Sequence, residues 1–436
     1  GTPLAEKRPS PVLKGGALAA VALGLMLMKA VPGVAAPAAN PPGEGAGVTI
    51  GTGSKTDTYA EKQIAIGVNT KTVSDGSAPN DSAIAIGSNA HTYNELGRRV
   101  AAVSFGKAHA DYTGGIAIGA NTYAITTGTA IGQRDYSGAM GDVIVSDTNR
   151  DILQYAPGAT TLGSNAYAGG TLATVIGAYN ISTSGYNGTS GLNTLNYAVQ
   201  NLGSTILGTL NTNESATAPS PVIFGSSYSG IANSLVGVAN RTYNANGTLI
   251  MGAGNEVTNS VVDIDVDATT ASSSVNELAD TLRGAVKRSE GGATLAIGGG
   301  NTADWTQVSQ VIGVGNKLTG TSGAVSKYNL LDGYKNIAAN VEHVSVIGSE
   351  NTVTHGKSNV VIGDNHKLTG TSSAKIMNNI VLGSADAEKE IAVSDAVLIG
   401  HNADVQKEGG VALGSGSLAD RGAFTASTKG AFSDFE

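Results

Sequence analysis

The sequence contains no cysteine, and only 5% of its residues are aromatic and 14% charged. The absence of cysteine excludes disulfides and thiol chemistry. With so few aromatics, the chain lacks the large side chains that fill the thick core of ordinary globular domains. Yet 41% of the residues are apolar, which is too many for a disordered chain. A thin core that repeats along one axis satisfies all of these limits.

Glycine accounts for 61 of the 436 residues, about twice its usual share of ~7%. The formal net charge is −8. An acidic surface of this kind disfavours anionic partners such as nucleic acid and acidic lipid. We therefore expect a glycine-rich repeat structure that binds neither.

The first 38 residues have the order of a secretory signal peptide. Basic residues come first, at Lys7, Arg8 and Lys14. An apolar run follows at residues 17–28, and small residues occupy 34–39. The run would span about 18 Å as a helix, too little for a hydrocarbon core of ~30 Å. We predict an export signal over residues 1–38 and a linker over 39–47.

From residue 48 to residue 420 one short phrase recurs, which reads apolar, small or apolar, apolar, glycine. It is Ile-Ala-Ile-Gly at residues 64–67, 84–87 and 116–119. Nineteen copies can be counted, one of them ending at Gly225, and most lie 12 to 20 residues apart. Such self-similarity is typical of a solenoid. The structural repeat glycines are predicted to include Gly67, Gly87, Gly106, Gly119, Gly163, Gly177, Gly298, Gly313, Gly348, Gly363, Gly383, Gly400 and Gly414.

Each phrase is predicted to form a strand, because it combines period-two spacing with β-branched residues. An asparagine follows the glycine by two or three positions in thirteen of the nineteen copies. Glycine and asparagine both tolerate left-handed backbone, so we predict a tight turn. A second, more polar strand then returns, which makes a β-roll coil of about 15 residues. The turn asparagines are predicted to include Asn69, Asn89, Asn121, Asn165, Asn301, Asn316 and Asn351.

The middle residue of the phrase would be polar if one face of the strand met water. It is instead apolar in sixteen of the nineteen copies, so the strand is apolar on both faces and should be buried on both. One face fills the roll, and the other must meet something outside it. Packing of identical chains around a shared axis is the simplest solution, although the pattern alone does not set their number.

The phrase and its following Ser-Asn-Ala, clearest at residues 84–90 and 160–166, resemble the head repeat of the YadA-like trimeric autotransporter adhesins. The resemblance covers residues 48–420. It implies an all-β, left-handed parallel β-roll with three chains per head, exported to the bacterial surface. It also implies attachment to host matrix proteins such as collagen, to host-cell receptors or to other bacteria.

We also expect no cofactor, no catalytic residue and no metal site, because no motif in the sequence supports one. Contact with the outer membrane would be made only through a C-terminal stalk and anchor, neither of which is recognisable before residue 436. Residues 411–421 resemble the last repeat where it enters the neck of such a head. Residues 421–436 are therefore expected to start the neck or to end a truncated head.

Four intervals break the spacing and are predicted to hold insertions, near residues 133–159, 181–204, 256–294 and 314–344. Solenoids accept insertions at turns, where they often carry binding. The third interval places apolar residues at helical spacing, namely Val275, Leu278, Leu282 and Val286. This spacing predicts a short amphipathic helix that leans on the roll or on a partner chain. It would serve in binding or form a decorative element without a ligand.

Two sets of polar residues are candidates for metal binding. Asp263, Asp265 and Asp267 alternate along a predicted strand. Alternating carboxylates can bind calcium, but we interpret these as a solvated strand face that blunts edge pairing. The histidines lie at different distances from their repeat glycines, so we expect no stacked column and no cluster: His91, His109, His343, His355, His366 and His401.

The leading hypothesis is therefore a multivalent adhesive rod that is not an enzyme. Two alternatives remain open. A secreted β-solenoid enzyme acting on carbohydrate would need a cleft with convergent carboxylates. A non-adhesive spacer or fibre would share the same repeat.

Overall fold

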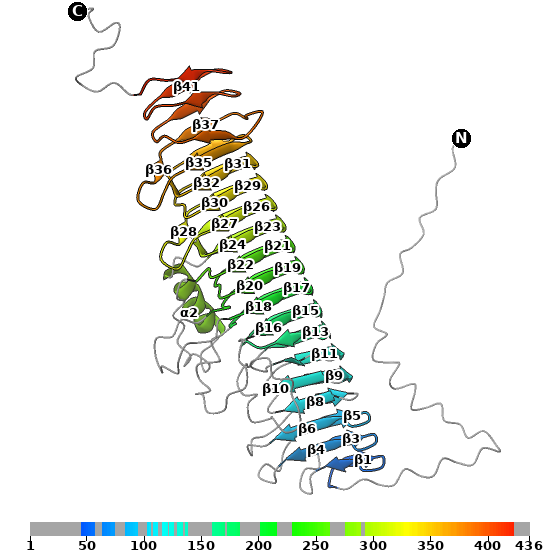
Figure 1. The fold of residues 1–436 in the computed structure, drawn as a ribbon. Coiled ribbons are helices and arrows are strands. Elements are labelled where there is room, and N and C mark those ends of the chain that lie inside the picture. The colour runs from blue at the N-terminus through cyan, green and yellow to red at the C-terminus, as the bar shows by residue number, and fades with distance from the viewer. Residues whose placement is uncertain are drawn as a thin grey trace, which may run out of the picture.

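The computed structural model describes a rod of parallel strands stacked as one β-solenoid, with a helix beside it (Figure 1). The all-β solenoid prediction is therefore confirmed. The strand β1 lies at one end of the rod and β41 at the other. The described residues are 45–422 except 57–62, 75–82, 95–102, 106–107, 112–115, 121, 126–128, 134–135, 138–158, 171, 184–200, 216–228, 262–274 and 289–292. The predicted export signal lies outside them.

The repeat phrase forms sheet A, which has 19 strands. Each strand pairs in parallel with the strands of the preceding and following coils, so equivalent phrase positions stack along the rod. The strands are β1 (Val48–Ile50), β3 (Ile64–Ile66), β5 (Ile84–Ile86), β7 (Val103–Phe105), β9 (Ile116–Ala120), β11 (Thr129–Gln133), β13 (Thr160–Ser164), β15 (Thr174–Ala178), β17 (Thr205–Thr209), β19 (Ser234–Val238), β21 (Leu249–Ala253), β23 (Thr294–Gly299), β26 (Ser309–Val314), β29 (Leu330–Tyr334), β31 (Ser345–Ser349), β34 (Val360–Ile362), β37 (Ile380–Leu382), β39 (Val397–Ile399) and β41 (Val411–Leu413).

The returning strands form sheet B, which is also parallel. Two further strands, β40 (Asp404–Val405) and β42 (Leu418–Ala419), pair with each other in the last coils. Sheet B contains β2 (Lys55–Thr56), β4 (Lys71–Ser74), β6 (His91–Asn94), β8 (Ala108–Asp111), β10 (Thr122–Ile125), β12 (Tyr136–Ser137), β14 (Tyr167–Ala168), β16 (Ile181–Thr183), β18 (Thr212–Glu214), β20 (Arg241–Tyr243), β22 (Glu256–Thr258), β24 (Thr302–Asp304), β27 (Lys317–Thr319), β30 (Ile337–Ala339), β32 (Thr352–Thr354), β35 (His366–Thr369) and β38 (Lys389–Ile391).

Between residues 306 and 377 the coils have a third strand-bearing side, which the two-strand coil of the prediction lacked. Four short strands lie there, paired in parallel as β25 (Thr306–Gln307) with β28 (Ser326–Lys327) and β33 (Gly356–Lys357) with β36 (Ile376–Met377). Isolated bridges through Glu342 join the two pairs. We call this third side the sheet C face.

The repeat glycines form a column because the phrases stack in register. Gly313 lies opposite Gly298 in one neighbouring strand and Gly333 in the other. Its φ is 109°, and a Cβ atom there would lie 2.0 Å from the carbonyl oxygen of Gly333. Only glycine fits such a close approach of two backbones. Gly106 lies outside the described residues, and the other predicted glycines share a positive φ: Gly67, Gly87, Gly119, Gly163, Gly177, Gly298, Gly348, Gly363, Gly383, Gly400 and Gly414.

Two details of the predicted repeat need correction. β17 pairs directly with β19, so no coil ending at Gly225 lies between them. Conversely, residues 314–344 are not an insertion, since β29 occupies them as a regular strand of sheet A between β26 and β31. Its phrase, Leu-Leu-Asp-Gly at residues 330–333, was missed because Asp332 takes the place of the second flanking apolar residue.

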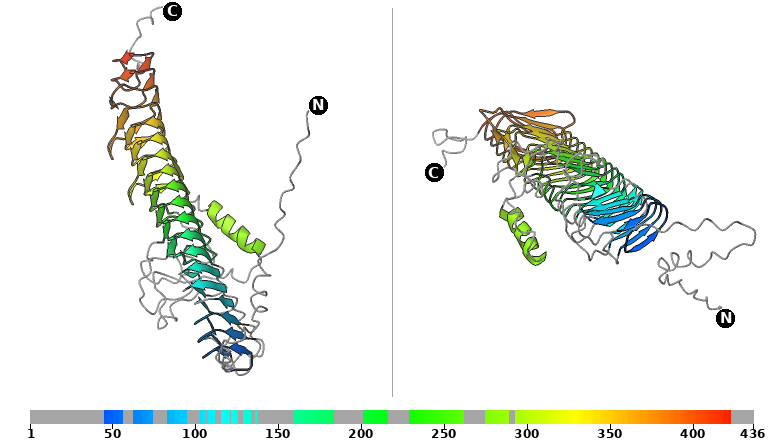
Figure 2. Two further views of the ribbon diagram at one scale, coloured as in Figure 1. Left: turned by 90° about the vertical axis from the view of Figure 1, so that its right-hand side faces the viewer. Right: turned by 90° about the horizontal axis from the view of Figure 1, so that it is seen from below.

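The other three intervals lie between strands that pair directly across them, β11 with β13, β15 with β17, and β21 with β23. The last of these contains the predicted helix, α2 (Val275–Arg288). Figure 2 shows α2 standing beside the coils and not within them. Whether it also leans on a partner chain stays a prediction.

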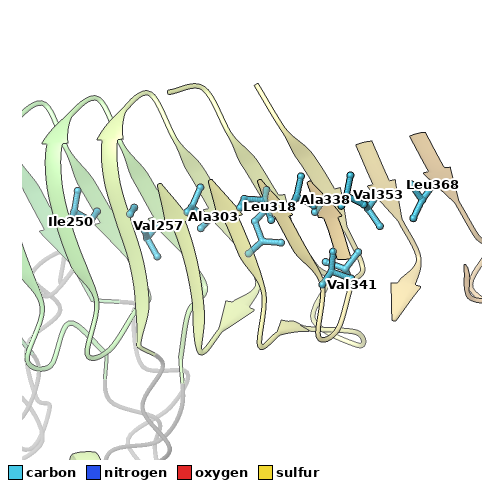
Figure 3. Packing of buried hydrophobic residues seen from close by; sticks show 14 of the residues in the cluster. Ile250, Val257, Ala303, Leu318, Ala338, Val341, Val353 and Leu368 are labelled. Carbon is cyan, nitrogen blue, oxygen red and sulfur yellow. The ribbon is translucent and has the colours of Figure 1, made fainter. Parts of the chain in front are cut away.

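The core is a narrow layer of side chains between sheets A and B (Figure 3). Where the side chain is described, the middle residue of the phrase is buried, from Ala65 near one end to Leu398 near the other. The middle residue of each returning strand meets it, as Val257, Leu318 and Leu368 do. The flanking residues of the phrase therefore lie on the outer face of sheet A. The apolar middle residue fills the roll, and the apolar flanks are what must meet something outside.

Candidate interaction surfaces

The predicted turn asparagines fall into two structural classes. Asn69, Asn89 and Asn165 stand two positions after their glycines and have left-handed φ angles of 53° to 58°, as predicted. The prediction was wrong for the asparagines that stand three positions after the glycine, Asn301, Asn316 and Asn351. Their φ is not positive, and their side chains are fully buried. Asn121 lies outside the described residues.

The buried class forms a ladder along the inside of the turn between sheets A and B. Each side-chain Nδ2 donates to the Oδ1 of the preceding asparagine at 2.9–3.2 Å. It also donates to the carbonyl oxygen of the repeat glycine in the next coil at 2.6–2.9 Å. The ladder satisfies buried polar groups along the stack. Its members are Asn180, Asn211, Asn240, Asn255, Asn301, Asn316, Asn336 and Asn351.

His366 takes the next place in this ladder. Its backbone N–H donates to Asn351 Oδ1, and its Nε2 contacts the carbonyl oxygen of Gly383. Burial lowers the pKa of the imidazole, although the Gly383 carbonyl opposes that shift. Its Nδ1 is buried and finds no hydrogen-bond partner within the described part of the chain. The ladder therefore ends on a neutral imidazole that donates from Nε2.

The outer face of sheet A carries an apolar column, formed by the residue directly before each repeat glycine. The strand registers stack these residues one above another over the length of the sheet, about 85 Å at the usual strand spacing. Asp332 is the single charged member. The apolar members are Ile50, Ile66, Ile86, Phe105, Ile118, Ile131, Leu162, Ile176, Leu207, Val236, Met251, Ile297, Ile312, Ile347, Ile362, Leu382, Ile399 and Leu413.

The described members of the apolar column are partly or largely exposed to solvent in the single chain. Leu207 and Met251 are each 47% exposed, and Leu413 is 63% exposed. Exposed apolar residues just beyond the glycines widen the column toward sheet B, for example Val238 and Val314. A continuous apolar surface of this length marks an interaction site.

The other predicted polar candidates give no comparable site. Asp263, Asp265 and Asp267 lie outside the described residues. Within the described residues, no three His, Asp or Glu side chains are close enough together to hold a metal ion. The histidine prediction was wrong for one pair, since His91 in β6 lies in register with His109 in β8. His91 follows Gly87 by four positions and His109 follows Gly106 by three, and this difference in offset concealed the alignment.

No protein-family model and no curated protein matches the chain. Among the described residues there is no helix with both the length and the apolar character to cross a membrane.

Proposed function

We propose that this chain is the head of a bacterial surface adhesin that acts as an elongated homotrimer. The observation that carries the proposal is the apolar column on the outer face of sheet A. Three copies of a parallel solenoid can turn these columns toward a common axis, and the remaining faces then stay in contact with solvent. The number three comes from the resemblance of the repeat to autotransporter heads.

The energetics of the apolar column favour association. Burying a half-exposed isoleucine or leucine contributes about 1 kcal/mol. A column of this length therefore offers a driving force of the same order as the ~4–15 kcal/mol that association costs. The residues at the start of each strand are less uniform, because Thr129, Thr160, Thr174 and Thr205 occupy that position in the central coils. The column before the glycines is the continuous feature, and we place the shared axis there.

The first experiment measures absolute mass by light scattering during size exclusion for residues 39–436. We expect three chains for the unmodified protein. The register partners Ile347 and Ile362 are then both replaced by Asp, which should give single chains that remain folded. The matched control replaces Thr354 and Thr369 by Asp, which are register partners on the outer face of sheet B and should leave the mass at three chains. A soluble single chain for the unmodified protein would refute the proposal.

Adhesion is tested with the same trimer, displayed on beads and applied to collagen, to epithelial cells and to bacteria. A multivalent rod should lose adhesion gradually as whole coils are deleted, because many weak contacts share the binding. Complete loss after one surface substitution outside the apolar column would contradict this model. Retention of the trimer without adhesion to any of the surfaces would leave a structural fibre as the better description.

A further inference from the structure

The sheet C face carries a cluster of basic residues on an otherwise acidic chain. Its register places Lys327, Glu342 and Lys357 in successive coils, one above another. Lys375, in the loop before β36, reaches the same place, with its Nζ 4.0 Å from a carboxylate oxygen of Glu342. Lys357 Nζ lies 3.3 Å from the same oxygen. Two ammonium groups thus flank a single carboxylate, and Lys327 adds a third positive charge in the neighbouring coil, so positive charge is in excess on this face.

These lysines are available to an outside partner. The side chains of Lys357 and Lys375 are about two-fifths exposed, at 42% and 41%. Ion pairs in such exposed positions contribute little and exchange readily. Glu342 therefore holds the ammonium groups close together through weak ion pairs, and a polyanion can displace its carboxylate and bind them.

An exposed aromatic stack borders the lysines. The rings of Tyr328 and His343 lie nearly parallel, with centroids 4.7 Å apart and an interplanar angle of 18°. Each directly follows a member of the cluster in sequence, Lys327 or Glu342. Tyr328 is 41% exposed. Aromatic rings at a surface offer a negative π face to which the C–H groups of a sugar can pack.

Two similar loops lie on either side of the cluster along the rod. Lys-Leu-Thr-Gly-Thr-Ser occurs at residues 317–322 and again at 367–372, three coils and so about 14 Å apart. In each loop a threonine side chain, Thr321 or Thr371, accepts a hydrogen bond from the amide of the alanine three residues on. Both loops project from the same side of the rod, beside β28 and β36 (Figure 1).

From this arrangement we propose that the sheet C face between the two loops binds an anionic polysaccharide of the sulfated glycosaminoglycan type. The lysines bind sulfate and carboxylate groups, and the Tyr328–His343 stack packs against a sugar ring. The open face and the spacing of its charges over successive coils suit an extended polymer. The face lies on a different side of the coil from the apolar column, so it stays accessible in a trimer. This inference rests on the proposed adhesive function, because it names the binding surface and the ligand class.

The test measures binding of heparin to the full trimer at about 0.15 M salt and over a salt series. Replacing Lys327, Lys357 and Lys375 together by Ala should weaken binding about tenfold or more and make the slope of log K against log salt shallower by about two to three. The matched control replaces three exposed lysines outside the cluster and its two bordering loops, Lys71, Lys335 and Lys407, and should change binding far less. Equal losses in the two variants would overturn the site, because net charge alone would then explain binding.

Two further variants test the ligand class. Their expected effects, a gain in affinity and a loss for one ligand only, could not arise from a variant that simply fails to fold. Glu342→Gln frees two lysines from their carboxylate and should raise heparin affinity a few-fold. Tyr328→Ala should weaken heparin binding but not binding of a DNA duplex, and an equal effect on both would overturn the polysaccharide assignment. Adhesion to cells without any affinity for heparin would refute this site and leave the adhesin proposal standing. Binding of heparin without adhesion to any surface would refute the adhesive function instead.

Discussion

Replacement of Asn316 tests whether the interior asparagines stabilise the rod as a ladder or simply permit a turn. The Nδ2 of Asn316 donates to Asn301 Oδ1 at 3.2 Å and to the carbonyl oxygens of Ile312 and Gly333 at 2.8 Å each. Its Oδ1 accepts from the backbone N–H and the Nδ2 of Asn336 at 2.9 and 3.0 Å. Substitution by Ala or Gly removes all five hydrogen bonds from a fully buried site.

The magnitude follows from the groups left without partners. A net hydrogen bond contributes about 1 kcal/mol, and a buried group left unsatisfied costs about 1–3 kcal/mol. Because some donors shift to other acceptors, we expect Asn316→Ala and Asn316→Gly each to lower the free energy of unfolding by about 3–5 kcal/mol. Asn69 is the control, since its φ is 53° and its side chain is exposed. Asn69→Gly should change stability by less than about 0.5 kcal/mol.

The measurements are urea denaturation of the protein and hydrogen exchange of the Asn336 backbone amide, which donates directly to Asn316 Oδ1. Exchange is needed because repeat arrays can unfold in parts, and a single midpoint then averages several events. The Asn336 amide should exchange much faster in Asn316→Gly, with little change in coils far along the rod. If Asn316→Gly were as harmless as Asn69→Gly, the turn explanation would hold and the ladder would carry no stability.

Two further substitutions test the close backbone packing and the end of the ladder. Gly313→Ala should lower the free energy of unfolding by more than about 3 kcal/mol, because the added Cβ would lie 2.0 Å from the Gly333 carbonyl oxygen. Gly315→Ala is the control, because Gly315 has a φ of 66° and its nearest neighbour atom would lie 3.5 Å from the added Cβ. In thermal unfolding this control should cost only about 1 kcal/mol. Burial lowers the pKa of His366 below the ordinary histidine value of about 6.5. The unfolded chain therefore binds the proton more readily, and stability falls as the pH drops below about 6.5. His366→Asn should remove this part of the pH dependence while extending the ladder, and an unchanged pH profile of urea midpoints would show that His366 is not its source.

The strand positions were predictable because the middle residue of each phrase has the same environment in every coil. It must fill the narrow space between sheets A and B, so it is apolar at nearly every coil, from Ala85 to Leu398. The coil at Gly333 escaped prediction for the converse reason. Asp332 lies on the outer face of sheet A and so leaves the core of the roll unchanged, whereas Leu331 keeps the inner position. A search for the buried middle residue alone would have found this coil.

The two roles of asparagine were not predictable from residue type. Asn165 and Asn180 both follow a repeat glycine closely, by two and three positions. The one-residue difference moves the side chain from a partly buried left-handed position to the fully buried inside of the coil. Where Asn takes the inner place, a different residue adopts the left-handed backbone, for example Tyr179 or Glu350. The offset between each asparagine and its glycine was visible in the sequence. Its structural effect, however, depends on which backbone carbonyl of the next coil the asparagine side chain reaches, and only the stacked coils show that.

The sheet C face was beyond sequence reasoning because its strands are only two residues long and show no hydrophobic period. Its lysines also come from coils up to 48 residues apart, from Lys327 to Lys375, and their assembly depends on the register of the coils between them. Stacking thus produces two surfaces of opposite character from one repeat. The phrase repeats its apolar flank in almost every coil and builds a continuous surface suited to copies of itself. The third side varies from coil to coil and builds a local surface, which is where recognition of a different molecule can be encoded without disturbing the core.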